Sequence, residues 1–213
     1  MLVVISNPEA VADEATIINE LFDEGLKILH LRKPSIAIDE IRSLLEKIKP
    51  QYYQQIALHQ HHEMADDFGI NRLHYTEEKS KKLLHSSPLL GLQVPHVSSG
   101  RGGGGEVILS ISIHQIEEYK NLSDRFDYTF FGPVFDSISK VGYTSSLSDD
   151  FVFPVEPGRP KVIAIGGIDF SNVQKVKEMN FDGVATLGTI WKKPEESVRQ
   201  FKTLQKAWEQ TGR

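Results

Sequence analysis

The sequence predicts a single-domain (β/α)8 barrel, the TIM-barrel fold class, and three observations support this prediction. Short apolar runs alternate with amphipathic stretches along the chain, as parallel strands connected by helices do. The length of 213 residues suits one such barrel. Two late apolar runs end in glycine, at the place where this fold commonly binds phosphate. We therefore treat residues 1–213 as one domain.

The predicted strands are short and apolar, as expected for strands that are buried on both faces of a parallel sheet. In chain order they are Leu2–Ile5, Leu26–Leu31, Ile56–Leu58, Arg72–His74, Val107–Ile113, Tyr128–Phe131, Val162–Ile165 and Val184–Leu187. Right-handed crossovers between eight parallel strands favour closure into a barrel. An open doubly wound sheet is the alternative, and the lack of an N-terminal Gly-x-Gly-x-x-Gly fingerprint counts against it.

Two N-terminal helices are predicted from apolar residues at helical spacing. The first spans Ala12–Asp23, with Ile17 and Leu21 on one face. The second spans Ile36–Ile48 and ends before Pro50.

Two stretches are predicted to be loops. Four consecutive glycines in residues 98–105 cannot hold a helix or a strand against their backbone entropy. Residues 136–153 join the sixth and seventh predicted strands and are rich in serine. A long loop at the catalytic end of a barrel is a candidate lid.

Composition excludes several classes of protein. A formal net charge of −5 argues against a general nucleic-acid binder. The absence of cysteine excludes disulfides, thiol catalysis and cysteine-based metal sites, and it suits a reducing compartment. No run approaches the roughly 20 apolar residues of a membrane span, and the N-terminus does not read as a signal peptide. We expect a cytoplasmic protein that binds small phosphorylated substrates, and a homo-oligomer is compatible with these features.

The two glycine-ended strands predict a phosphate site. They are Lys161–Ile168 and Gly183–Thr189, and the glycines at their ends are Gly166, Gly167 and Gly188. Without side chains, these residues let an anion approach the backbone N–H groups. We expect a helix to follow each strand directly and to add its positive N-terminal end.

Five segments resemble the thiamine-phosphate synthase family in the same order along the chain. They are Leu29-His-Leu-Arg32, Ser112-Ile-His114, Gly132-Pro-Val-Phe135 followed by Ser137-Ile-Ser-Lys140, Ala164-Ile-Gly-Gly-Ile168 and Asp182-Gly-Val-Ala185. The resemblance covers nearly the whole chain, from the second strand to the eighth. It implies an enzyme that joins hydroxymethylpyrimidine diphosphate to thiazole phosphate and releases pyrophosphate.

The resemblance also implies roles for individual residues. Arg32 and Lys140 would hold the diphosphate, Ser137 and Ser139 would donate hydrogen bonds to it, and Ser112 would lie beside the leaving group. Gly132 belongs to the same substrate site, and Gly166, Gly167, Gly188 and Thr189 would bind the thiazole phosphate. Mg²⁺ would be held mainly by the substrate diphosphate, and no organic cofactor is implied.

The sequence departs from the family pattern at the metal-binding positions. His59-Gln60 replaces an Asn-Asp pair, and Lys79 replaces a second aspartate. Because Mg²⁺ prefers carboxylate oxygens, Glu77 and Glu78 are the remaining candidate ligands. Lys33 is one residue earlier than the family lysine, so we expect it to face away from the site.

Two other functions are open at this point. The same superfamily contains thiazole tautomerases, which move a proton and need no metal. The resemblance places their histidine at Pro133 of this chain. His114 and His30 therefore remain as candidate acid/base groups. A non-catalytic binder of thiazole phosphate or thiamine phosphate is the third hypothesis.

A local histidine cluster follows the third predicted strand and has residue types that can bind a metal. It comprises His59, His61 and His62, with Glu63 beside them. Without a second ligand pair at fixed spacing, we interpret the segment as a solvated helix start.

Overall fold

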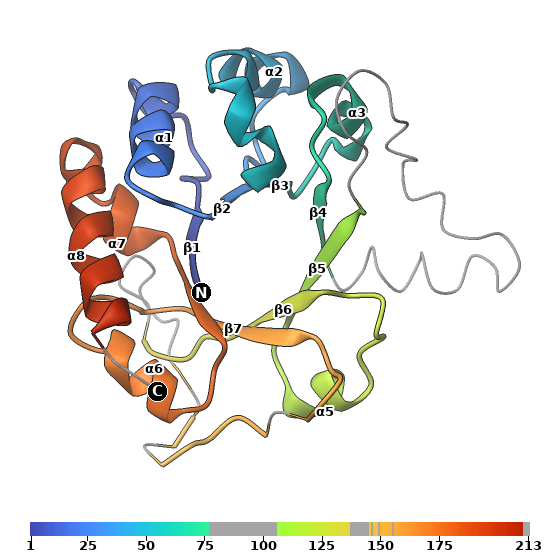
Figure 1. The fold of residues 1–213 in the computed structure, drawn as a ribbon, viewed down its shortest axis with the longest axis vertical. Coiled ribbons are helices and arrows are strands. Elements are labelled where there is room, and N and C mark those ends of the chain that lie inside the picture. The colour runs from blue at the N-terminus through green and yellow to red at the C-terminus, as the bar shows by residue number, and fades with distance from the viewer. Residues whose placement is uncertain (77–105, 137–144, 146, 149, 155, 211–213) are drawn as a thin grey trace, which may run out of the picture.

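The computed structural model of the chain is a closed parallel barrel in which each strand pairs with its neighbours in sequence (Figure 1). The structure describes residues 1–76, 106–136, 145, 147–148, 150–154 and 156–210. Strand β8 closes the barrel on β1, with Val3 opposite Ala185. The predicted (β/α)8 class is therefore confirmed.

The strands lie close to their predicted positions, with differences of one or two residues at the ends. They are β1 (Leu2–Ile5), β2 (Ile28–Leu31), β3 (Ile56–Leu58), β4 (Arg72–Tyr75), β5 (Ile108–Ile113), β6 (Tyr128–Phe131), β7 (Lys161–Ile165) and β8 (Gly183–Thr186). Strand β2 begins two residues later than predicted because Leu26 still belongs to the turn that ends the first helix. Its N–H donates to the Leu21 carbonyl at 3.0 Å.

Helices surround the barrel on the outside (Figure 1). They are α1 (Glu14–Asp23), α2 (Ile38–Glu46), α3 (Ala65–Phe68), α5 (Ile116–Lys120), α6 (Val173–Glu178), α7 (Gly188–Trp191) and α8 (Ser197–Glu209), with 3-10 turns at Pro50–Gln55, His62–Met64 and Pro194–Glu196. Over the residues that the structure describes, no helix has both the length and the apolar character that a membrane crossing requires.

Alternation along the strands separates the apolar residues into two layers. Leu29 and Leu31 of β2 belong to the outer core beneath the helices. Ile28 belongs to the inner core, together with Tyr128 and Phe130 of β6. Since side chains alternate along a strand, His30 must point into the barrel with Ile28. The inner layer is where the polar residues of the site are found.

Candidate active site at the mouth of the barrel

The inner face of the barrel holds a connected group of polar side chains. In β4, the His74 ring lies between two serines of β5: Nδ1 is 2.9 Å from the Ser110 hydroxyl and Nε2 is 3.1 Å from the Ser112 hydroxyl. His74 and Ser110 are buried, and Ser112 is partly exposed. Ser112, the predicted neighbour of the leaving group, thus lies on the inner face and is held by His74.

His30 lies deeper in the barrel than expected for a residue predicted to bind substrate. Its side chain is fully buried, and both of its ring nitrogens contact protein side chains. Nδ1 is 2.9 Å from His59 Nε2, and Nε2 is 2.7 Å from the Tyr128 hydroxyl. Both ring nitrogens of His30 are therefore occupied by contacts within the protein.

The histidine-rich segment after β3 divides between two environments. His61 lies on the surface side, where its Nδ1 is 3.2 Å from Glu63 Oε1, as a solvated helix start predicts. That interpretation is wrong for His59, whose ring lies inside the barrel against His30 and stacks on His74 with ring centroids 4.0 Å apart. We call His30, His59 and His74 the three-histidine cluster.

Sequence reasoning missed the three-histidine cluster because its members are far apart in the chain. One signal was available: His30 and His74 are the next-to-last residues of β2 and β4, and His59 directly follows β3 between them. Residues at matching positions of adjacent parallel strands face the same side of the sheet.

Burial lowers the pKa of all three imidazoles. Desolvation is the largest cause in each case, and the positive charges of His62 and Arg32 add to it for His74, whose pKa falls to about 3. The pKa values of His30 and His59 are also well below the ordinary value. At neutral pH the cluster therefore consists of neutral rings, each with one lone pair.

These lowered pKa values predict that acid destabilises the metal-free protein. In the unfolded chain His74 takes up a proton near pH 6.5, whereas in the folded chain it does so only near pH 3, so stability falls as pH drops below about 6.5. We expect His74 to account for about 2 kcal/mol of the loss between pH 7 and pH 5. Urea denaturation across this range would measure it. A His74→Gln variant with an unchanged pH slope would contradict the assignment.

Arg32 stands at the carboxyl end of β2, on the same side of the strand as His30. Its backbone is fixed by Ser6, which follows β1 and is fully buried. The Arg32 N–H donates to Ser6 Oγ at 2.9 Å, and the Ser6 hydroxyl donates to the Arg32 carbonyl at 3.1 Å. Ser6 thus holds the end of β2, with the predicted diphosphate ligand Arg32, against the end of β1. Ser6 was not identified from the sequence.

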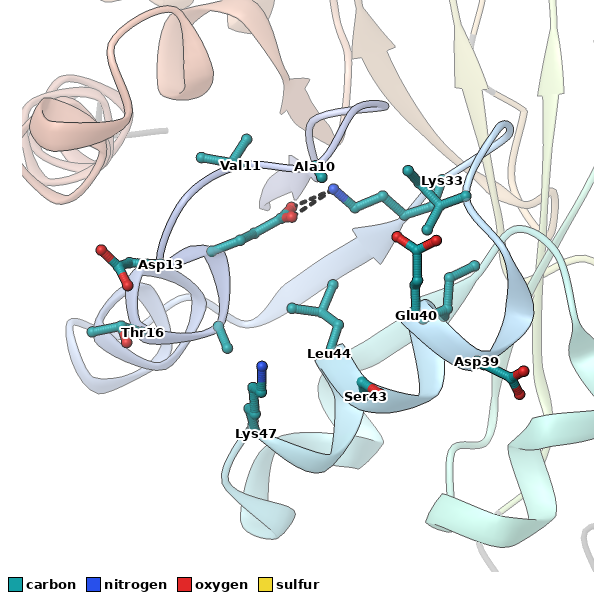
Figure 2. A pocket seen from close by; sticks show the side chains of 14 residues that line it. Ala10, Val11, Asp13, Thr16, Lys33, Asp39, Glu40, Ser43, Leu44 and Lys47 are labelled. Atoms are coloured by element: carbon teal, nitrogen blue, oxygen red, sulfur yellow. Dashed lines mark hydrogen bonds and ion pairs between the residues drawn. The ribbon is translucent and has the colours of Figure 1, made fainter.

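Lys33 faces the opposite way, as its position predicted. It is 2% exposed, and its ammonium group donates to both carboxylate oxygens of Glu14 in α1, at 2.7 and 2.6 Å, and to the Glu9 carbonyl at 2.7 Å. Figure 2 shows this ion pair beside a cavity of about 510 Å³ between α1 and α2. Among the described residues, none of the sequence-predicted site residues lines that cavity.

The glycine turns after β7 and β8, here called the corner, agree with the prediction in one respect and differ in another, and phosphate binding there remains a prediction. Helix α7 begins directly at Gly188, as expected. The prediction of a helix directly after Gly167 is wrong, because α6 begins only at Val173. Asn172 instead shapes a turn here: its side-chain amide donates to the Gly167 carbonyl at 2.8 Å.

Thr189 connects the two turns of this corner. Its hydroxyl donates to the Ile168 carbonyl at 2.5 Å. Gly188 and Thr189 also line a cavity of about 260 Å³ that includes Lys192 and Lys193. Asp169 and Glu196 line the same cavity, and Lys193 pairs with Glu196 at 3.5 Å, so the lining is mixed in charge and Lys192 is the cation that favours an anion there.

The glycines of the corner have a second role that the sequence did not reveal. The chain after β6 packs directly on the β7 turn: the Val134 N–H donates to the Ile165 carbonyl at 2.9 Å. A Cβ atom on Gly132 would lie 2.0 Å from that carbonyl oxygen, and one on Gly167 would lie 2.2 Å from the Asp136 carbonyl oxygen. Close backbone packing therefore requires these glycines, whether or not a ligand is bound.

His114 follows β5 at the exposed end of the site. Its Nδ1 is 2.7 Å from the Gly132 carbonyl oxygen. Because a carbonyl can only accept, Nδ1 carries the proton, and Nε2 is left with the lone pair in the neutral ring. This is the tautomer that a general base needs.

Several predicted site residues lie outside the described residues. They are Ser137, Ser139, Lys140, Glu77, Glu78 and the Gly-rich loop of residues 98–105. At the edges of the candidate lid, the Ser145 N–H donates to Asp136 Oδ1 at 2.8 Å, and Phe153 is fully buried. The predicted lid remains a prediction.

The donors at one of the two expected metal positions do not fit Mg²⁺. His59 presents an imidazole to the barrel interior. Gln60 stands where the resemblance implies an aspartate, and its amide Nε2 is buried with no hydrogen-bond partner in the described part of the chain. Mg²⁺ takes oxygen ligands, carboxylates above all, so neither residue replaces the aspartate.

Sequence comparisons place the chain in one family. The sequence model of the thiamine monophosphate synthase family matches residues 2–190. The chain is similar to the thiamine-phosphate synthases of Clostridium tetani (strain Massachusetts / E88), at 36% identity over 88 residues, and Staphylococcus carnosus (strain TM300), at 34% over 100 residues. These alignments cover 41% and 44% of this chain, and 42% and 47% of the relatives, so they span less than half of each relative.

Solved structures extend the similarity over the whole barrel. A thiamine phosphate pyrophosphorylase from Bacteroides thetaiotaomicron is 25% identical, with a TM-score of 0.71 and coverage of 100% of this chain and 99% of the other. The thiamine phosphate pyrophosphorylase from Pyrococcus furiosus shares the fold at 17% identity, with a TM-score of 0.70 and coverage of 98% and 95%.

Proposed function

Because the chain belongs to the thiamine monophosphate synthase family, we propose that it is a transferase that joins hydroxymethylpyrimidine diphosphate to thiazole phosphate and releases pyrophosphate. One observation carries the proposal. The family-like segments at the ends of β2, β5, β6 and β7 belong to one closed parallel barrel, so their carboxyl ends meet at a single mouth, and the fifth segment forms most of the neighbouring strand β8.

The chemistry asks the protein to stabilise a departing diphosphate. When the bond from the pyrimidine carbon to the diphosphate oxygen breaks, the electron pair leaves with the diphosphate, so negative charge grows on the leaving group. Arg32 and Lys140 are the cations assigned to that charge, and Ser112, Ser137 and Ser139 are the assigned donors. Their effect is greatest where water is excluded.

The other substrate is assigned to the corner after β7 and β8. Backbone N–H groups of Gly166, Gly167 and Gly188, together with Thr189, would bind the phosphate of the thiazole. Lys192 in the adjoining cavity would add positive charge on the same side, whereas Lys193 there is paired with Glu196. Because the donors at Gln60 do not suit Mg²⁺, any Mg²⁺ would enter with the substrate diphosphate, and no protein metal site takes part in this proposal.

A direct assay tests the transferase. Purified protein mixed with both substrates and Mg²⁺ should form thiamine phosphate, measured by chromatography. We expect Lys140→Ala to lower kcat by about 10²-fold or more, as the loss of a group that stabilises developing charge does. Lys120→Ala, an exposed lysine at the end of α5, is the matched control and should leave kcat unchanged. Equal turnover by the two variants would remove Lys140 from the mechanism.

A second candidate function is supported by the geometry of His114. Because the Nδ1–H group of His114 donates to the Gly132 carbonyl, the lone pair of Nε2 can accept a proton, as a thiazole tautomerase requires. That activity would survive chelation of divalent ions and would be lost in His114→Gln. If thiazole phosphate binds but neither activity is found, the chain is a non-catalytic binder.

A further inference from the structure

The three-histidine cluster has the donors of a transition-metal site, and nothing in the transferase proposal uses it. The strands β2 and β4 and the residue directly after β3 contribute one imidazole each. One ring nitrogen from each histidine lies within 4.8 Å of the others. Over the described residues, no other group of three or more histidine, aspartate or glutamate side chains converges in this way.

The surroundings of the cluster resemble those of a metal site. Metal-binding histidines usually engage their second nitrogen with a nearby polar group, which fixes the ring. His30 has the Tyr128 hydroxyl at 2.7 Å from Nε2. His74 has serine hydroxyls at both ring nitrogens, so metal binding would replace one of these contacts and keep the other. Phe130 packs against His30 and His74, so the inner side is apolar. His59 is partly exposed, whereas His30 and His74 are buried, so the cluster is nearest to solvent on the His59 side.

The protonation of the cluster is compatible with binding. Neutral imidazole is the form that binds a metal, and burial lowers the pKa of each ring below its ordinary value. One proton now lies between His30 Nδ1 and His59 Nε2. For both of these nitrogens to bind a metal ion, the proton must move to the other nitrogen of its ring. If it moves to His30 Nε2, that N–H can donate a hydrogen bond to the Tyr128 hydroxyl. The serine hydroxyls accept or donate, so they suit either tautomer of His74.

We propose that the three-histidine cluster binds one divalent transition-metal ion of the Zn²⁺ class through His30 Nδ1, His59 Nε2 and one ring nitrogen of His74. Imidazole suits Zn²⁺, Co²⁺, Ni²⁺ and Cu²⁺, whereas Mg²⁺ prefers oxygen. Two nitrogens bound to a tetrahedral Zn²⁺ are about 3.3 Å apart. To reach that distance, His30 Nδ1 and His59 Nε2 would have to separate from their present 2.9 Å, and one nitrogen of His74 would have to leave its serine partner.

The fourth position favours an anionic or solvent ligand. Three protein ligands plus an open position are typical of catalytic rather than structural zinc sites. The positive charge of Arg32 is close enough to lower the pKa of His59 and His74, so it opposes a bare dication. A hydroxide, chloride or phosphate oxygen in the fourth position would offset that repulsion.

Metal binding by the untagged full-length protein, cleared of metal with a chelator, tests the site. Titration with Co²⁺ should give one ion per chain with the intense visible absorption of a tetrahedral centre, and Zn²⁺ should displace it while Mg²⁺ should not. We expect His59→Gln and His74→Gln each to weaken binding at least tenfold. His61→Gln is the matched control, because His61 is near His59 in sequence but lies outside the cluster. Wild-type protein that binds no Co²⁺, or a His59→Gln variant that binds it as tightly as wild type, would overturn the proposal.

Thermal unfolding provides a measurement that does not depend on the stability of the variants. A ligand that binds only the folded state raises Tm. At a free Zn²⁺ concentration ten times Kd, Tm of the wild-type protein should rise by about 3–6 °C. The same rise should be seen in His61→Gln and should be absent with Mg²⁺. No rise with Zn²⁺, or a rise that is lost in His61→Gln, would count against the cluster.

Discussion

Replacing Lys33 with methionine is expected to lower the free energy of unfolding by about 3–5 kcal/mol, because it leaves a carboxylate buried without its cation. Glu14 is 5% exposed, and Lys33 donates to both of its carboxylate oxygens. Burial raises the pKa of Glu14, and the Lys33 ammonium opposes that shift. Urea denaturation monitored by circular dichroism would measure the loss.

Two further variants separate the buried charge from other effects. Lys33→Met combined with Glu14→Leu should recover most of the lost stability, because apolar residues can replace a buried ion pair at little cost. Lys49→Met breaks an exposed pair with Asp23 and should have a much smaller effect. If Lys33→Met is no more destabilising than Lys49→Met, the buried pair does not hold α1 against the strand end.

Gly167→Ala is expected to destabilise the protein by about 2–5 kcal/mol. The residue has φ of +64°, which costs an alanine about 1–2 kcal/mol. Its Cβ atom would also lie 2.2 Å from the Asp136 carbonyl oxygen, and overpacking of this kind costs about 1–3 kcal/mol more. Thermal or urea unfolding would measure the sum.

Gly69→Ala is a matched control for this variant. Gly69 has nearly the same φ, +65°, but nothing lies within 4 Å of its added Cβ. It should therefore show only the backbone cost, and the difference between the two variants measures the packing of the β6 segment on the β7 turn. Equal losses would mean that the Asp136 carbonyl moves away freely.

Much of the barrel could be predicted from the sequence because its signals are local. A short apolar run bounded by turn residues is consistent with a buried strand, and alternation of side chains along a strand predicts which side each residue faces. The opposite orientations of Arg32 and Lys33 follow from that alternation alone, and the ion pair of Lys33 with Glu14 confirms the orientation of Lys33. The end of α1 was less predictable, because Leu26 satisfies an apolar strand pattern while its N–H closes the helix.

The sequence by itself thus determined the fold class, the strand positions and the family-like residues at the strand ends. Only the tertiary structure decided which side chains and backbone atoms those residues contact. His30, His59 and His74 are brought together by the pairing of β2, β3 and β4, and Gly167 is constrained by a carbonyl 31 residues earlier in the chain. The physical reason is that periodicity acts between near neighbours, whereas a hydrogen bond, a clash or a lowered pKa depends on atoms that strand pairing places side by side.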